Sequence, residues 1–116
     1  MKQKSYKIKS RIWITTEEGT FLGEGRIALL KEIEEHGSIS KAAKAMKMSY
    51  KKAWELVNSM NKQGPELLVT PTIGGTGGGG STLSDAGKKA IKIFTELNTG
   101  NRTYLDNQLK EIEFQK

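Results

Sequence analysis

Residues 38–57 read SISKAAKAMKMSYKKAWELV, and this stretch decides the fold. Serine, a preferred residue at helix N-caps, precedes each of two apolar-periodic segments, at Ser38 or Ser40 and again at Ser49. The first segment has mainly small residues on its apolar side: Ile39, Ala42, Ala43 and Met46. The second runs to about Gln63 with Ala53, Leu56, Val57 and Met60 on its apolar side. We therefore predict two short helices that pack closely across the link Lys47-Met48.

The residues before this stretch predict a strand hairpin and a further helix. Residues 6–15 alternate polar and apolar with β-branched and aromatic side chains, which is typical of a strand. Turn residues follow at 16–19, and 20–22 can return as a short second strand. An apolar stripe then predicts a helix from about Gly25 to His36, with Gly37 placed as its C-terminal stop.

The residues after it predict a second hairpin and a long helix. Strand residues 67–70 lead through the run GGTGGGGST to a possible return strand at 82–83. Ser84 then opens a helix that continues towards the C-terminus and is either continuous, kinked or split at residues 99–101. The expected fold is mainly α with small β: a winged helix-turn-helix with an N-terminal strand or hairpin, a glycine-rich wing and a long C-terminal helix.

This order predicts two parts of the chain. Residues 1–83 form the winged helix-turn-helix, with the recognition helix at about 49–63 and the wing at about 67–83. Residues 84–116 form the C-terminal helix, which we expect to serve in dimerisation. A chain of 116 residues otherwise corresponds to one ordinary domain.

Charge is distributed unevenly along the chain. The formal net charge is +6, and basic residues concentrate in 2–11 and 38–63, whereas 24–36 is acidic. Such segregation favours a polyanionic partner, and plain solubility is the alternative explanation for the net charge alone.

Several function classes are excluded or disfavoured. The chain has no cysteine, which removes disulfides, thiol catalysis and cysteine-based zinc sites. No apolar run approaches a membrane span and the N-terminus lacks the apolar core of a signal peptide, so we expect a cytoplasmic protein without a membrane partner. Glu32 and His36 share a helix face, but a solvated helix end explains them better than a metal site. We expect no cofactor, no metal and no enzyme activity.

The recognition helix carries the predicted DNA-binding residues. With Ser49 as cap, Tyr50, Lys51 and Lys52 fall on its first turn, the part of a helix-turn-helix that enters the major groove. Lysine can donate to guanine and tyrosine can meet a base or a phosphate. The alternative is a solvated basic face on a helical hairpin. Trp54, one turn later, is interpreted as a half-buried core or edge aromatic.

The glycine run is interpreted as a wing tip. Gly75, Gly77 and Gly80 formally match the G-x-G-x-x-G pattern, but a strand rather than a helix follows, and no lysine precedes Ser81 as a phosphate-binding loop would require. Glycines bring backbone N–H groups close to phosphates, and Thr76 is the one tip side chain able to bond. A simple linker is the alternative.

The C-terminal helix is too long to pack entirely on so small a body. We expect it to pair with a second copy, with a frayed tail as the alternative. The residues predicted for this dimerisation are Phe94, Leu97, Tyr104, Leu105, Leu109 and Ile112.

Residues 22–87 resemble the N-terminal DNA-binding domain of ModE-type molybdate-responsive regulators, which are relatives of LysR-type helix-turn-helix proteins. The markers are residues 23–26 (GEGR), 37–40 (GSIS), 48–51 (MSYK) with 53–54 (AW), and the glycine wing. The resemblance implies a dimeric winged helix that binds an operator and regulates transcription, linked to molybdate or molybdenum metabolism. It also implies DNA contacts at the residues already named on the recognition helix, and phosphate contacts before it. The full predicted set is Ser38, Ser40, Lys41, Ser49, Tyr50, Lys51, Lys52 and Thr76.

This sequence departs from the family pattern in three ways. Full-length members carry C-terminal molybdate-binding domains, whereas the present chain ends at Lys116 like the stand-alone versions, so the resemblance gives no support for molybdate binding by this chain. Lys47 stands at a turn position that family members fill with glycine, and Thr76 stands where they carry a basic residue. The prediction is a sequence-specific DNA-binding regulator that binds double-stranded DNA as a homodimer. The alternative is a winged-helix protein-interaction module without specific DNA readout.

Overall fold

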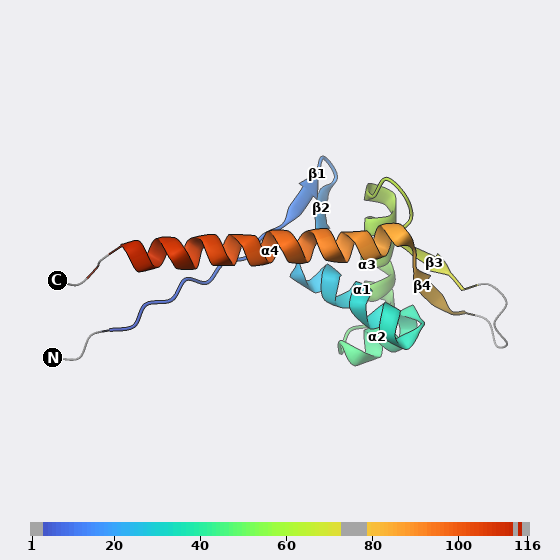
Figure 1. Cartoon of the computed structure of the whole chain (residues 1–116). Helices are drawn as coiled ribbons and strands as arrows, with labels where there is room; N and C mark the ends of the chain where they lie inside the picture. The colour runs from blue at the N-terminus through green and yellow to red at the C-terminus, as the bar shows by residue number, and fades with distance from the viewer. Residues whose placement is uncertain (1–3, 73–78, 113, 115–116) are drawn as a thin grey trace.

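The computed structural model describes residues 4–72, 79–112 and 114. It is mainly helical with two small antiparallel hairpins, β1–β2 and β3–β4, which confirms the predicted fold class (Figure 1). The elements in chain order are β1 (Ile14–Thr16), β2 (Gly19–Leu22), α1 (Glu24–His36), α2 (Ile39–Ala45), α3 (Tyr50–Gln63), β3 (Val69–Pro71), β4 (Ser81–Leu83) and α4 (Asp85–Glu111).

The core lies where α1, α2 and α3 meet the first half of α4 and the base of the second hairpin. Leu29, Leu30 and Ile33 of α1 are completely buried at its centre. The alanines of α2 and α3 let these short helices approach closely, since a small side chain adds little to the interhelical distance. The buried members of this contact are Ala42, Ala43 and Ala53.

Each helix boundary in the helix-turn-helix has an identifiable cause. Gly37 ends α1 in the left-handed conformation (φ 76°), as predicted for a glycine at this position. Ser38, rather than Ser40, caps α2 by accepting a hydrogen bond from the Lys41 backbone N–H at 3.0 Å. Lys47, in the turn before α3, has a φ of 56°, a conformation that costs a non-glycine residue about 1 kcal/mol.

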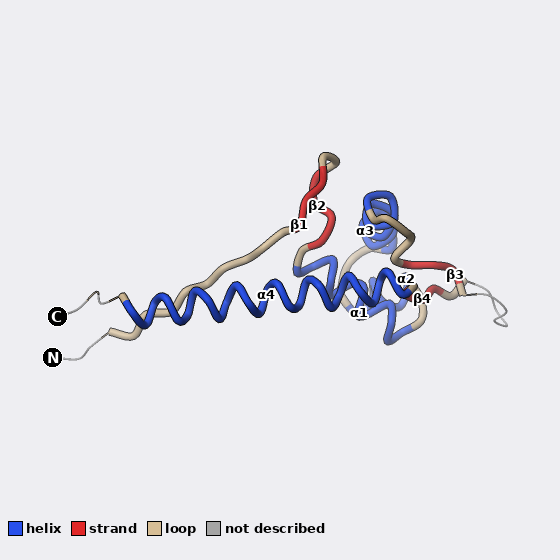
Figure 2. Tube along the Cα trace, turned by 45° about the horizontal axis from the view of Figure 1, so that its top comes forward, coloured by secondary structure: helices blue, strands red, loops and turns tan. Residues whose placement is uncertain are grey.

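Helix α4 extends well beyond the folded body, as Figures 1 and 2 show. Its 27 residues correspond to about 40 Å, and the molecule measures 66 × 29 × 21 Å. The radius of gyration is 18.3 Å, against about 13 Å for a compact chain of this size. The helix runs without interruption through 99–101, so the possible kink or split at Gly100 does not occur.

The predicted strand over 6–15 is wrong for most of its length. Only residues 14–16 form a strand, and residues 4–13 run as an extended arm beside α4 (Figure 2). The alternating pattern requires a neighbouring strand to become a sheet, and a helix offers no free backbone groups to pair with. Side chains hold the arm instead: Asn101 Nδ2 donates to Ser10 Oγ at 3.1 Å, and the rings of Tyr6 and Phe114 lie 5.1 Å apart.

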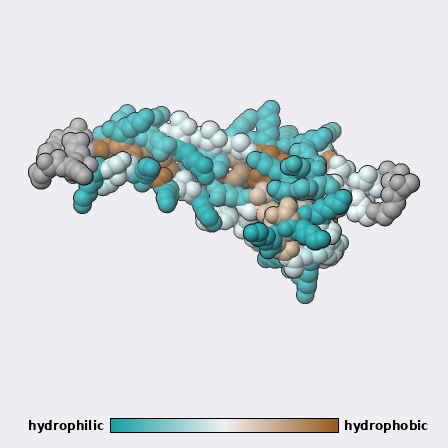
Figure 3. All heavy atoms as spheres, turned by 90° about the horizontal axis from the view of Figure 1, so that it is seen from below, coloured by the Kyte–Doolittle hydropathy of each residue, from teal (hydrophilic) through white to brown (hydrophobic). Residues whose placement is uncertain are grey.

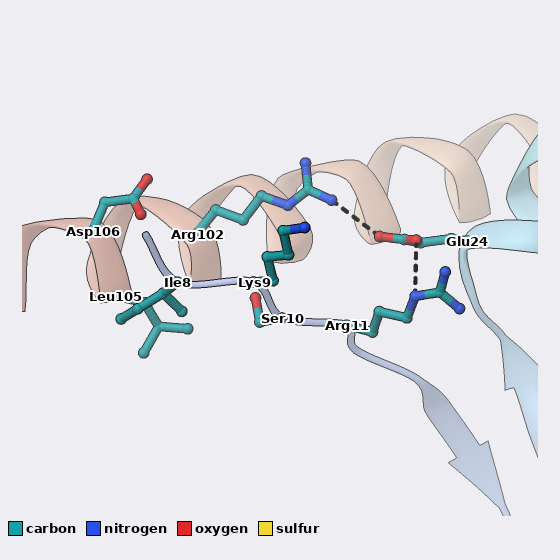
Figure 4. A pocket seen from close by; sticks show the side chains of 8 residues that line it. All are labelled: Ile8, Lys9, Ser10, Arg11, Glu24, Arg102, Leu105 and Asp106. Atoms are coloured by element: carbon teal, nitrogen blue, oxygen red, sulfur yellow. Dashed lines mark hydrogen bonds and ion pairs between the residues drawn. The ribbon is translucent and has the colours of Figure 1, made fainter. Parts of the chain in front are cut away.

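The arm is also held where it meets the start of α1 (Figure 4). Glu24 accepts a hydrogen bond from Arg102 of α4 at 3.0 Å and lies 3.8 Å from Arg11 of the arm. Its carboxylate also stands in the first turn of α1, where the helix dipole favours negative charge. One side chain therefore joins three segments that are distant in sequence.

Hydrophobic surface remains on the projecting half of the molecule. Figure 3 shows brown residues there between hydrophilic neighbours, and further brown and light-brown residues among the hydrophilic ones of the folded lobe. Among the described residues, no helix has both the length and the apolar character needed to cross a membrane. The division of the chain at residues 83 and 84 stays a prediction. The structure does place Gly87, Ala90 and Phe94, in the first turns of α4, among the buried residues.

Candidate nucleic-acid interface

The start of α3 is built as the sequence predicts. Ser49 caps the helix, its side-chain oxygen accepting from the Lys52 backbone N–H at 3.0 Å. Tyr50, Lys51 and Lys52 follow on the first turn and are all exposed, with Tyr50 at 55%. The cap fixes where the helix begins, and it thereby fixes which side chains occupy the first turn.

Helical geometry separates these three side chains. The buried side of α3 is formed by Ala53, Val57 and Met60. At about 100° per residue, Lys51 points directly away from that side, and Tyr50 and Lys52 lie on its two flanks. The outward face is therefore centred on Lys51.

Three further residues share this face. Glu55, Asn58 and Lys62 lie four, seven and eleven positions after Lys51, which places them on the same side of the helix, and all are exposed. The sequence prediction missed them because it considered the first turn alone. The spacing of i, i+4, i+7 and i+11 was the available signal.

The predicted residues on α2 lie at the start of that helix. Ser40 and Lys41 are exposed on the first turn of α2, and Ser38 is half-buried with its hydroxyl used as the cap. Thr76, predicted at the wing tip, lies outside the described residues. The DNA contacts themselves stay predictions.

The wing base is fixed to α3 through one amide side chain. Asn61 Oδ1 accepts hydrogen bonds from the backbone N–H groups of Leu68 at 2.8 Å and Val69 at 3.0 Å. Its Nδ2 donates to the Val69 carbonyl at 3.0 Å. These bonds tie the last turn of the recognition helix directly to β3.

The other wing strand is fixed to the turn between α1 and α2. The Ser81 backbone N–H donates to the Gly37 carbonyl at 2.8 Å. Because β3 and β4 pair with Val69 opposite Leu83, both strands of the wing base are held against the helix-turn-helix. We conclude that the described part of the wing and the recognition helix form one unit.

An arginine joins α1 to α3. Arg26 Nη1 donates to Ser59 Oγ at 2.9 Å and approaches the Phe21 carbonyl at 3.5 Å. Partial burial lowers the pKa of Arg26 from its ordinary value by desolvating the guanidinium. This arginine positions helices, in contrast to the exposed lysines.

The residues considered as a metal site in the sequence lie at the end of α1. His36 and Glu32 contact each other at 2.9 Å on α1. In the part of the chain that the structure describes, no three histidine, cysteine or carboxylate groups gather closely enough to hold a metal ion.

The predicted dimerisation residues divide into three groups by burial. Phe94 is 2% exposed in the protomer's own core, which removes it from any contact with a second copy. Leu105 and Leu109 are half-buried, and Leu105 lines the groove under the arm together with Ile8. The exposed members are Leu97, Tyr104 and Ile112.

Known proteins with similar sequences were found. The molybdenum transport protein ModE of Azotobacter vinelandii is 40% identical over 97 residues, which is 84% of this chain and 36% of that protein. The transcriptional regulator ModE of Yersinia pestis is 43% identical over 83 residues, 72% of this chain and 32% of that protein. The chain is homologous to ModE-type regulators. A third relative, the DNA-binding transcriptional dual regulator ModE of Escherichia coli (strain K12), is 41% identical over 81 residues, 70% of this chain and 31% of that protein.

The homology covers a part of each relative. The present chain spans about a third of the length of these ModE proteins. No family model matches the chain. The two relatives named as regulators support the prediction that the chain is not an enzyme, because their names describe transcriptional control.

Proposed function

We propose that this ModE-type chain is a sequence-specific DNA-binding transcriptional regulator that binds its operator as a dimer and acts in molybdate or molybdenum metabolism. The observation that carries the DNA-binding part is the outward face of α3, capped at Ser49 and centred on the exposed Lys51. The link to molybdenum rests on the names of the relatives, one of which is a molybdenum transport protein.

DNA binding can be tested on duplexes selected by the wild-type protein from fragments of its own genome. If each protomer of a dimer neutralises about four phosphates, the logarithm of the binding constant should fall with the logarithm of salt with a slope near −7. Enrichment of molybdate transport or molybdenum-cofactor genes among the fragments would support the metabolic role. Binding that loses all fragment preference at raised salt would contradict specific readout and favour the protein-interaction alternative.

Lys51→Ala tests the assignment of the outward face. We expect a loss of about 1–3 kcal/mol on a selected duplex, because lysine at the centre of the face can donate to a base or a phosphate. Lys110→Ala removes the same charge from the last turn of α4 and should leave the affinity close to that of the wild type. Equal affinities for Lys51→Ala and the wild type would refute the assignment.

The dimer part of the proposal rests on an open apolar stripe along α4. Ile93, Leu97 and Tyr104 share one side of the helix and are 40%, 52% and 63% exposed. A helix that projects from its body and exposes such a stripe is well suited to pairing with a second copy. Ile93 was not among the residues predicted from the sequence.

Leu97→Glu should convert the dimer into a monomer in sedimentation equilibrium, because it places a charge in the middle of the stripe. Thr95→Glu introduces the same charge on the opposite side of α4 and should leave the dimer intact. A monomeric wild-type protein at the concentrations used for DNA binding would contradict this part of the proposal without touching the assignment of α3.

A further inference from the structure

A cleft of about 160 Å³ separates the recognition helix from the base of the wing. Trp54 and Asn58 of α3 line one wall, and Thr70 and Pro71 of β3 line the other. Trp54 is 49% exposed, so a large part of its indole faces the cleft opening or the solvent. The structure leaves about half of Trp54 exposed, and the sequence-based interpretation of Trp54 as a half-buried core or edge aromatic does not explain that exposed half.

The width of this cleft is fixed by the bonds that hold the wing. The three hydrogen bonds of Asn61 to the backbone of Leu68 and Val69 hold the base of the wing at a set distance from α3. Tryptophan left half-exposed between two rigid elements is costly in apolar surface, which favours an external occupant.

The chemistry of the walls favours an anionic occupant with apolar parts. Among the described residues that line the cleft, none is a carboxylate. Two other clefts differ in this respect, because the groove under the arm includes Glu24 and Asp106 and the one beside Lys62 includes Glu18 and Glu55. The cleft supplies uncharged donors instead, namely the amide of Asn58, the hydroxyl of Thr70 and the indole N–H of Trp54.

We propose that this cleft holds one sugar–phosphate strand of the bound duplex, with the Trp54 indole against a deoxyribose and its N–H available to a phosphate oxygen. This inference rests on the proposed DNA-binding function. With α3 in the major groove, a wing reaches the adjacent groove, and the strand that separates two grooves must then pass between helix and wing. Phosphate and sugar contacts from uncharged side chains are common in protein–DNA interfaces.

The two tryptophans of the chain provide a matched pair for the test. Trp13→Phe leaves Trp54 as the sole tryptophan, and Trp54→Phe leaves Trp13, which is 61% exposed at the end of the arm. Quenching by acrylamide, a neutral molecule, is measured with and without duplexes selected by the wild-type protein. We expect DNA to lower the quenching constant of Trp54 at least twofold and to leave that of Trp13 unchanged.

A second measurement separates a backbone contact from a base contact. Trp54→Phe keeps the aromatic packing and removes the N–H, so we expect about a tenfold loss of affinity, the typical effect of losing one hydrogen bond to a charged group. The loss should be equal on selected and random duplexes, with the salt slope unchanged because no charge is removed. Trp13→Phe should bind like the wild type.

The outcomes distinguish this inference from the function on which it rests. A DNA-bound Trp13→Phe protein whose Trp54 stays as accessible as in the free protein would overturn the cleft assignment and leave DNA binding intact. If Trp54→Phe lost affinity for the selected duplex only, Trp54 would contact a base, and the cleft assignment would again be overturned. A wild-type protein that binds no duplex would refute both proposals together.

Discussion

Gly87→Ala is expected to destabilise the protein, because α4 passes unusually close to the strand leading into the wing at this residue. A Cβ at Gly87 would lie 2.3 Å from the Leu68 carbonyl oxygen and 3.2 Å from its carbonyl carbon. Both are backbone atoms, which cannot swing aside as the end of a side chain can. Overpacking of this kind costs about 1–3 kcal/mol, and the better helix propensity of alanine returns at most about 1 kcal/mol. We expect a net loss of about 1–2 kcal/mol.

Gly100→Ala is the matched control on the same helix. Gly100 is exposed, and a Cβ there would meet nothing within 4 Å. The substitution should therefore gain up to about 1 kcal/mol from helix propensity alone. The two glycines thus predict opposite signs for the same chemical change.

Urea denaturation followed by far-ultraviolet circular dichroism would measure both variants. Protein concentration must be held constant, because any association of folded chains adds to the apparent stability. In thermal unfolding, 1 kcal/mol corresponds to about 4 °C for a chain of this size. If Gly87→Ala gained stability as Gly100→Ala does, α4 would not approach Leu68 as closely as described.

Two further substitutions test other parts of the helix-turn-helix in the same assay. Asn61→Ala should lower the free energy of unfolding by about 2–4 kcal/mol, because two backbone N–H groups at the wing base lose their acceptor. Asn58→Ala on the exposed face should change it by no more than about 0.5 kcal/mol. Similar values for both variants would show that the wing does not depend on Asn61. Lys47→Gly should stabilise the protein by about 1 kcal/mol, because glycine adopts the left-handed φ of 56° without strain. Lys44→Gly inside α2 should destabilise it by up to about 1 kcal/mol. A destabilising Lys47→Gly would contradict the assigned turn.

Local signals explain why the helix-turn-helix could be predicted. The caps at Ser38 and Ser49 and the stop at Gly37 act within a few residues of their own positions, so their sequence context is sufficient to place them. The choice of Ser38 over Ser40 required the structure, since both are serines within one turn of the helix start.

Tertiary partners explain what could not be predicted. Asn61 resembles any polar residue near the end of an amphipathic helix, and its role follows from the position of β3. Residues 6–13 have a strand pattern, but the neighbour that the fold provides is a helix. Phe94 and Leu97 have the same apolar character in the sequence, yet Phe94 is buried and Leu97 is exposed, because Phe94 lies on the side of α4 that carries Ala90 and Leu97 lies on the open stripe.

The length of α4 gives the molecule a lever. In a dimer joined through the stripe around Leu97, the part of α4 from Asp85 to Leu97, about 18 Å, would separate the joint from the start of the helix. A change of about 10° in the angle between the two copies of α4 would shift the two helix starts relative to each other by about 3 Å, close to the 3.4 Å step between base pairs. Small changes in the joint would thus become a mismatch with the spacing of two half-sites.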